Sequence, residues 1–437
     1  TGMFIWDFVD QSIYPYDAIK NNELVKNGFP NYITGYDRPG PHQGNFCNNG
    51  LINGDRSWSA ELTTVKNVYQ YVDFEKLDGQ TLTVRNAHYF TNLDALSLRW
   101  ELLRDGVVVQ KGKGQFGSVL PTKDTIITRP FNTKLDEWVE YFLNVYAVQD
   151  AATEWSPANY DIASHQFLLQ ARPEKLTEVK LFPNDKLTMK EGANGEITVS
   201  DGLSEFIFNK EGLYAWKFNK EQIIAPAPGN GPDYYDYRYT ENEETYGNPE
   251  IYDKGNGISK KEVSYALAKD GKSFTYTVKA EGSKANYVFT YTVYGNGTFD
   301  LDAQYTPVKS HLRRLGVNMV FAPGFEHVEY YARGPWSNYI DRKDGSHIGR
   351  YRSTVTDLYE PFARPQSTGN HEELRQFLLM KDNGFGVLVD TEGTVSFSAL
   401  HFDDIYLKTK LHQWEIEPSA ETYVHFDWRQ KGLGNGS

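Results

Sequence analysis

The opening run FIWDFVDQS carries the first residues whose types could do chemistry, the acids Asp7 and Asp10 among aromatic side chains. A retaining glycosidase needs two carboxyl groups roughly 5 to 5.5 Å apart. Successive side chains of a strand alternate between its two faces, so residues three apart point to opposite sides. The spacing of these two acids therefore predicts no catalytic pair.

A glycine-rich motif, GKGQFG from Gly112 to Gly117, matches the G-x-G-x-x-G pattern of dinucleotide-binding proteins. That pattern binds a dinucleotide only where a helix follows, because the helix N-terminus holds the pyrophosphate. Here the motif lies between two expected strands, and no amphipathic helix follows it. We therefore expect a turn and no nucleotide site.

Three further features have ordinary explanations. The segment NHEELR around His371 is similar to a zinc-protease helix, but Arg375 stands where the second imidazole would be needed, so we expect no zinc site. Cys47 is the only cysteine, which excludes an intrachain disulfide and leaves a cytoplasmic or periplasmic location open. The short glycosylation sequon at 296–298 is expected to form a hairpin turn.

The elements that position these residues begin with an apolar stretch, residues 4–9, that is hydrophobic on both alternating faces. Such a strand is covered on both sides in a folded protein and needs neighbours. No strand precedes it, so we expect the chain to begin inside a larger fold. A long loop rich in Gly and Pro follows at 27–58, and loops of that length in compact domains are usually functional.

A helix is expected over SAELTTVKNVYQYV, residues 59–72, because its apolar residues recur at helical spacing. Ser59 is the expected N-cap. The apolar face consists of Leu62, Val65, Tyr69 and Val72.

The rest of the chain is expected to form strands. Residues 73–172 carry short alternating stretches, including an Asp105-Gly106 hairpin turn, and predict an immunoglobulin-like β-sandwich. Residues 173–437 predict a large antiparallel β-sandwich, with 231–257 as an excursion between strands.

Composition supports a mainly β protein. Aromatic residues make up 15% of the chain, whereas Met occurs only 4 times, and this balance favours strands over helices. Acids outnumber bases 58 to 45, a net charge of -13, which opposes binding to nucleic acid or anionic lipid. No apolar run has the roughly 20 residues of a membrane span. Neutral sugars are compatible partners, since aromatic rings offer them flat apolar faces.

Three groups of motifs, spread over essentially the whole chain, carry a family resemblance. The run FIWDFVDQS, followed by GNFCNNGLINGDRS and then SAELTTVK, resembles the end of the catalytic barrel in large β-galactosidases of glycoside hydrolase family 2. The segment from YYARGPWSNYIDR to ARPQSTGNHEELR resembles the family's terminal sandwich. The closing HFDWRQKGLGNGS resembles the segment just before the family's last active-site tryptophan, which we expect to lie beyond this chain.

The resemblance implies a fold in three parts. Residues 1–72 would be the C-terminal end of a (β/α)8 barrel, comprising its eighth strand, a loop and a helix. Residues 73–172 would be the second immunoglobulin-like domain, and residues 173–437 the terminal sandwich. Because the remainder of the barrel is missing, we expect residues 1–65 to be poorly supported or unusually packed.

The resemblance also implies that this chain has no catalytic residue. In the family the two catalytic glutamates, the active-site histidines and the magnesium ligands lie on earlier barrel strands. We therefore expect the chain to be inactive alone and to supply the wall of the pocket, since barrel enzymes place their sites at the C-terminal ends of strands.

Three residues match binding positions of the family. Trp6 matches the tryptophan on which the apolar face of galactose lies. Phe46 and Asn49 match residues that give a backbone carbonyl and a side-chain oxygen to a sodium ion, itself in contact with the sugar, so Asn49 is expected to bind both substrate and metal. A third protein ligand would lie upstream, which leaves the sodium site incomplete here.

The function implied is that of a C-terminal portion of a retaining β-galactosidase acting on terminal non-reducing β-D-galactosides, homo-oligomeric as the parent enzyme. Two alternatives stay open. One is a carbohydrate-binding or purely structural module without catalysis, in which Trp336 would be a platform for glycans. The other is a family 2 enzyme of different β-glycoside specificity, since SWSAEL stands where the family usually carries P-H-P-A-L.

Overall fold

The computed structural model describes residues 3–128, 131, 133–173, 179–226, 258–308 and 312–432. The excursion expected at 231–257 and the last five residues of the closing segment lie outside these ranges.

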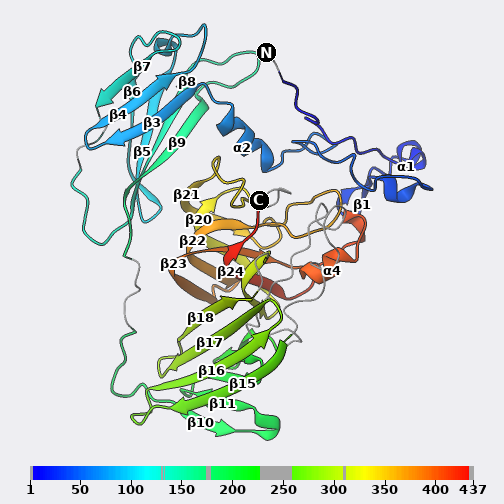
Figure 1. Ribbon diagram of the computed structural model, residues 1–437, viewed down its shortest axis with the longest axis vertical. Coiled ribbons are helices and arrows are strands. Elements are labelled where there is room, and N and C mark those ends of the chain that lie inside the picture. The colour runs from blue at the N-terminus through cyan, green and yellow to red at the C-terminus, as the bar shows by residue number, and fades with distance from the viewer. Residues whose placement is uncertain are drawn as a thin grey trace.

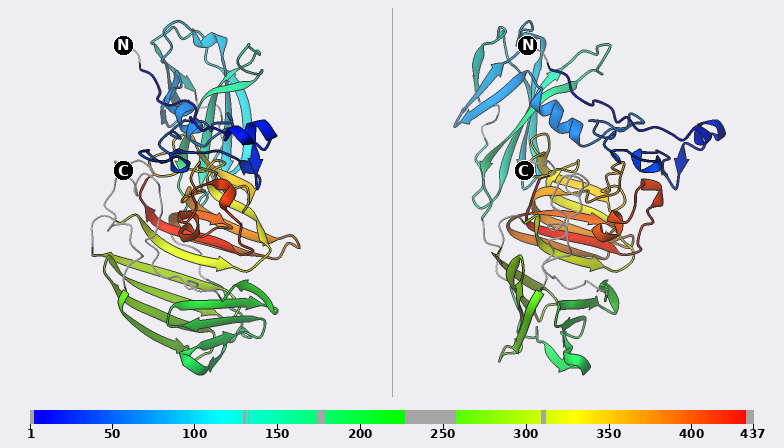
Figure 2. Two further views of the ribbon diagram at one scale, coloured as in Figure 1. Left: turned by 90° about the vertical axis from the view of Figure 1, so that its right-hand side faces the viewer. Right: turned by 45° about the vertical axis from the view of Figure 1, so that its right-hand side comes forward.

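The fold is mainly β, as the composition predicted. Figures 1 and 2 show a smaller β-sandwich at one end of the long axis and a larger one at the other, while the N-terminal residues extend sideways past both. The helices are short: α1 (Tyr16–Asn21), α2 (Glu61–Val68) and α4 (Asp404–Lys408). Within the described residues, no helix is long and apolar enough to cross a membrane.

The smaller sandwich has the two antiparallel sheets expected of an immunoglobulin-like domain. One sheet has the order β3-β4-β7 and the other β6-β5-β8-β9. Their strands are β3 (Val72–Asp78), β4 (Thr81–Asn86), β5 (Ser97–Arg104), β6 (Val107–Gln115), β7 (Asp124–Thr128), β8 (Tyr141–Gln149) and β9 (Tyr160–Gln170). The predicted hairpin turn is confirmed, since Asp105 and Gly106 join β5 to β6 with φ of 45° and 78°.

The turn predicted for GKGQFG is wrong. Gly112 lies inside β6, paired with Trp100 of β5, and the strand continues to Gln115. A Cβ at Gly112 would lie 2.7 Å from the Trp100 ring. The glycine thus lets the buried indole lie flat against the neighbouring strand, a packing requirement that the short motif could not reveal.

The larger sandwich packs two antiparallel sheets around one core. Among the described residues, one sheet has eleven strands in the order β10-β11-β12-β13-β14-β19-β24-β23-β22-β20-β21, and the other has the order β15-β16-β17-β18. The strands of the first are β10 (Thr188–Glu191), β11 (Ile197–Ser200), β12 (Ser204–Asn209), β13 (Gly212–Phe218), β14 (Glu221–Ile224), β19 (Arg314–Phe321), β20 (Phe325–Gly334), β21 (His347–Thr354), β22 (His371–Lys381), β23 (Gly386–Leu400) and β24 (Thr422–Gln430). Those of the second are β15 (Ile258–Leu267), β16 (Ser273–Gly282), β17 (Ala285–Tyr294) and β18 (Phe299–Pro307).

Alternating side chains of both sheets fill this core. Phe208 of β12 stacks on Tyr276 of β16 with ring centroids 4.8 Å apart, so the aromatic residues abundant in the sequence join the two sheets. The sequon at 296–298 forms the hairpin turn between β17 and β18, as predicted, with Gly297 at φ 80°.

A buried ion pair fastens the two sandwiches together. Arg375 of β22 donates to both carboxylate oxygens of Glu140, at 2.7 and 3.0 Å, and the Tyr331 hydroxyl donates to the same carboxylate. Beside it, Gln166 of β9 exchanges two 2.8 Å hydrogen bonds with the backbone of Ile348. The domain bounds expected at 72, 172 and 437 stay predictions.

The expectation of a strand covered on both faces is wrong for residues 4–9. Phe4 is 100% exposed and Trp6 80%, and Val9 makes an isolated parallel bridge to Ile52. The physical reason is that, among the described residues, only the segment around Ile52 pairs with this run. Its apolar side chains therefore lie largely in solvent, which is the unusual packing expected for the first residues of the chain.

The predicted helix is present as α2, but its expected cap is wrong. Ala60 is the N-cap, and the Ser59 hydroxyl instead donates to the Leu51 carbonyl. The Ala60 amide donates to the Glu360 carboxylate at 3.0 Å, so a distant acid caps the helix in place of the local serine. Val72, expected on the apolar face of the helix, begins β3 instead.

Candidate functional site

Two neighbouring segments of the N-terminal region carry the site residues expected from the sequence. Residues 7–12 run beside residues 47–52, and the two are joined like parallel strands. The Leu51 amide donates to the Asp7 carbonyl at 3.2 Å, and the Ile52 amide donates to the Phe8 carbonyl at 3.1 Å. In return the Asp10 amide donates to the Ile52 carbonyl at 3.0 Å.

The contact is so close at Gly50 that only a glycine fits. A Cβ there would lie 2.2 Å from the Asp10 amide nitrogen and 2.5 Å from the Val9 carbonyl carbon. The Gly50 amide donates to the Asp10 carboxylate at 2.7 Å. This packing fixes the loop that contains Phe46 and Asn49 against the segment that follows Trp6.

Asp10 has an unusual environment for a carboxyl group. Partial burial raises its pKa from 3.8 to about 6, against the lowering effect of its hydrogen bond from Gly50, and the nearby acids Glu61 and Asp7 raise it further. Asp7 accepts the Leu51 amide through its backbone carbonyl, and its carboxylate accepts a hydrogen bond from the Gln11 side-chain amide. The expectation that the run holds no catalytic pair stays a prediction.

Phe46 and Asn49 offer oxygen atoms to a cation. Asn49 is exposed, as is Phe46 at 51%. In the described part of the chain, neither the Phe46 carbonyl nor the Asn49 side chain takes part in a hydrogen bond, so both oxygens are available. Such neutral oxygens suit a hard monovalent cation. The same ranges hold no cluster of three or more His, Cys, Asp or Glu side chains suited to a metal.

An aromatic pair that sequence reasoning missed lies at the end of the same loop. Trp58 and Trp336 are about half exposed, and their ring centroids are 6.0 Å apart. Trp336 therefore packs at a junction between residues 1–72, called here the barrel-end segment, and the larger sandwich, called here the terminal sandwich. The signal in the sequence was the tryptophan of SWSAEL at the end of the long loop.

An open apolar groove of about 360 Å³ runs along α2 beside this pair. It is lined by Ile5, Trp58, Leu62, Val65, Lys66, Tyr69 and Tyr160. Three residues of the predicted apolar face of the helix thus line a groove.

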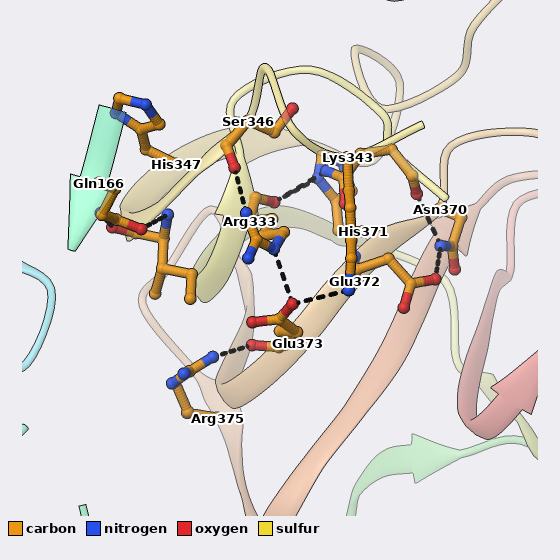
Figure 3. A network of polar contacts seen from close by, with 12 residues as sticks. Gln166, Arg333, Lys343, Ser346, His347, Asn370, His371, Glu372, Glu373 and Arg375 are labelled. Atoms are coloured by element: carbon orange, nitrogen blue, oxygen red, sulfur yellow. Dashed lines mark hydrogen bonds and ion pairs between the residues drawn. The ribbon is translucent and has the colours of Figure 1, made fainter. Parts of the chain in front are cut away.

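The polar residues around NHEELR form a hydrogen-bonded network on β20, β22 and the loop between β20 and β21 (Figure 3). Arg333 and Lys343 both pair with Glu373, at 2.8 and 3.0 Å. The His371 ring is hydrogen-bonded to the Arg333 carbonyl, and burial lowers its pKa to about 4. His371 lies on a strand, and its neighbours serve the packing of the sheet.

Comparisons with protein families match three successive parts of the chain. Residues 201–437 match the model of the beta galactosidase small chain, and residues 82–170 match domain 4 of beta-galactosidase. Residues 1–74 match the TIM barrel domain of glycosyl hydrolases family 2.

Individual relatives are named beta-galactosidase. A beta-galactosidase of Priestia megaterium is 26% identical over 99% of this chain and 42% of its own length, and one of Streptococcus thermophilus is 26% identical over 99% of this chain and 41% of its own. A beta-galactosidase of Staphylococcus xylosus is 33% identical over 34% of this chain. The chain thus spans about two fifths of the length of the first two relatives.

The family match to residues 201–437 covers more than half of the chain. It falls on the larger β-sandwich, so the comparisons agree with the fold and with the motifs. The chain belongs to the beta-galactosidase small chain family, and with its barrel-end segment to glycoside hydrolase family 2.

Proposed function

We propose that this chain supplies the wall of the sugar pocket and the bracing β domains of a retaining β-galactosidase that acts on terminal non-reducing β-D-galactosides. The observation that carries the proposal is the exposed indole of Trp6, which directly precedes a segment hydrogen-bonded to the loop of Phe46 and Asn49. An exposed tryptophan next to a segment fixed by backbone hydrogen bonds is suited to stack on a flat apolar face.

Trp6 would bind the sugar through its ring. Galactose presents C–H bonds on one face and hydroxyl groups on its rim, so the indole can cover the apolar face while the hydroxyls reach polar groups. Burying both faces removes apolar surface from water and favours binding by roughly 25 cal/mol per Å².

Asn49 and the Phe46 carbonyl would hold a sodium ion beside the sugar. When bound, the cation would offer a positive charge to the sugar hydroxyls. The chain's own part is to fix two neutral oxygens on a loop that hydrogen bonds hold beside the Trp6 segment. A third protein ligand and the magnesium ligands of the parent enzyme would come from outside this chain.

The chemistry of bond cleavage would also come from outside it. In a retaining enzyme one carboxylate attacks the anomeric carbon, and a second carboxyl protonates the leaving oxygen and then activates water. In this proposal the present chain orients the galactose for those groups. Subunit contacts through its β domains are part of the same proposal.

Galactose binding tests this proposal in the purified chain. Isothermal titration with galactose should give heat in the wild type and lose it in Trp6→Ala, because the stacking face is gone. The matched control is Trp155→Ala, since Trp155 is likewise exposed, at 70%, but lies in the immunoglobulin-like domain. The purified chain alone should not hydrolyse a nitrophenyl galactoside.

Equal heat from the wild type and Trp6→Ala would move the sugar site elsewhere in the molecule. Turnover that persists through repurification would mean that the catalytic carboxylates lie in this chain. Loss of heat in the Trp155 variant alone would favour a binding module on the immunoglobulin-like domain.

A further inference from the structure

The loop of residues 38–58, called here the pocket loop, lacks a core of its own. It carries Phe46, Asn49 and Trp58, and none of its residues is buried. A loop without buried side chains gains little from the hydrophobic effect, so its conformation must be fixed by hydrogen bonds and by its two ends. The backbone contacts to residues 7–12 hold its middle.

The N-terminal end of the pocket loop is bound to the terminal sandwich through a histidine. His412 is buried, and its two ring nitrogens lie 2.9 Å from Asp37 Oδ2 and 2.9 Å from Glu415 Oε1. Both partners are carboxylate oxygens, so the imidazole joins Asp37 of the loop to Glu415 of the sandwich. Asp37 also accepts the Thr34 amide at 2.8 Å, which closes a capping box around the short 3-10 helix Gly35–Asp37.

The C-terminal end of the loop is bound to the same sandwich through an acid. Glu360 accepts the Ala60 amide at 3.0 Å and thus caps α2 two residues after the loop ends. Arg342 lies 3.6 Å from Glu360 and 3.2 Å from Glu61, the first residue of the helix. The Ser337 hydroxyl donates to the second oxygen of Glu360, so the whole cap is supplied by residues some three hundred positions later in the chain.

A glycine brings the two parts into direct backbone contact at this end. A Cβ at Gly345 would lie 2.4 Å from the Thr63 carbonyl oxygen, so the sandwich loop packs on the helix with no room for a side chain. The Glu360 and Arg342 side chains are 15% and 10% exposed. Charges held this far from solvent interact more strongly than surface pairs do.

We propose that the Asp37–His412 contact at one end and the contacts of Glu360 with Ala60 and of Arg342 with Glu61 at the other form a two-point clamp, by which the terminal sandwich sets the position of the pocket loop. Asp37, His412, Glu360 and Arg342 are then positioning residues, which act on the pocket through the loop that they hold. The geometry of the clamp stands by itself, and its importance for sugar binding rests on the proposed function.

Hydrogen exchange followed by mass spectrometry tests the clamp in the full chain. Asp37→Asn and Glu360→Gln keep the size of each side chain but remove its charge. Each should raise exchange in peptides from 38–59 by about tenfold, while peptides of the sandwich core stay unchanged. The double variant should exchange faster than either single variant.

Two further variants separate a clamp from a general loss of stability. Asp37→Glu keeps the carboxylate, and glutamate is the residue most often found at this position of a capping box, so it should restore protection. Glu140→Gln weakens a buried ion pair at a different junction, that with Arg375 between the two sandwiches, and should leave exchange at 38–59 unchanged.

The clamp is overturned if Asp37→Asn and Glu360→Gln leave exchange at 38–59 unchanged, if Glu140→Gln raises it equally, or if Asp37→Glu behaves like Asp37→Asn. Galactose affinity is measured in parallel. Faster exchange with weaker galactose binding supports both the clamp and the sugar pocket. Faster exchange with unchanged galactose binding supports the clamp and contradicts the sugar pocket.

Discussion

At the scale of single residues, the site depends on a few side chains whose surroundings differ from those of ordinary surface residues. Trp6 is exposed although it is large and apolar, and Asp10 is partly buried although it is ionisable. The first suits a stacking ligand, and the second holds Gly50 in place. Both features lie within five residues of each other in the opening run.

Replacing Asp10 by asparagine should change how stability depends on pH. Burial raises the pKa of Asp10 to about 6, above its value of 3.8 in an unfolded chain. A raised pKa gives stability that is present below about pH 4 and lost as the pH rises through 6. Relative to that of the wild type, the free energy of unfolding of Asp10→Asn should therefore rise by about 1 kcal/mol between pH 4 and pH 7, after allowance for solvent screening. Urea denaturation at both pH values measures this, and a constant difference would contradict it.

At the scale of elements, sequence patterns predicted strands and turns well where the information is local. The Asp105-Gly106 turn and the alternating strands on either side of it could be read directly. The cap of α2 could not, because Ser59 is a good local candidate and yet Glu360 takes its place from across the molecule. The GKGQFG motif failed for a similar reason, since pairing with β5 and contact with Trp100 decide its conformation.

The parallel contact between residues 7–12 and 47–52 can be tested through Gly50. A Cβ in Gly50→Ala would meet the Asp10 and Val9 backbone, so the two segments must separate at a cost of about 1 to 3 kcal/mol. For each about 1.4 kcal/mol by which the contact is destabilised, hydrogen exchange of the Asp10 amide should then be about tenfold faster. The control is Gly40→Ala, where a Cβ meets nothing within 4 Å. Equal exchange in the two variants would rule out the close contact.

At the scale of the whole molecule, the terminal sandwich holds the other two parts. It reaches the immunoglobulin-like domain through Glu140 and Arg375 and the barrel-end segment through the clamp. The sequence predicted that these parts exist, but not which residues join them, because each joining pair is separated by more than two hundred positions. The same distance hid the contact between Trp58 and Trp336.

The Glu140–Arg375 pair gives a test of how firmly the sandwiches are joined. Glu140→Leu leaves Arg375 as an unpaired buried cation and should cost about 3 to 5 kcal/mol. The double variant Glu140→Leu with Arg375→Met removes both charges and should recover more than half of that loss. Thermal denaturation of the three proteins measures the effect. Additive losses in the double variant would show that the two side chains do not act as a pair.

The central claim is that Trp6 binds the apolar face of galactose, and fluorine NMR of the full chain labelled with 5-fluorotryptophan tests it most directly. The Trp6 resonance is assigned by its absence in Trp6→Phe, and the titration compares galactose with mannitol in sodium buffer. We predict that the Trp6 resonance shifts with galactose and saturates, while that of the exposed Trp155 stays in place. A Trp6 resonance that does not move with galactose, or that moves equally with mannitol, would contradict the account.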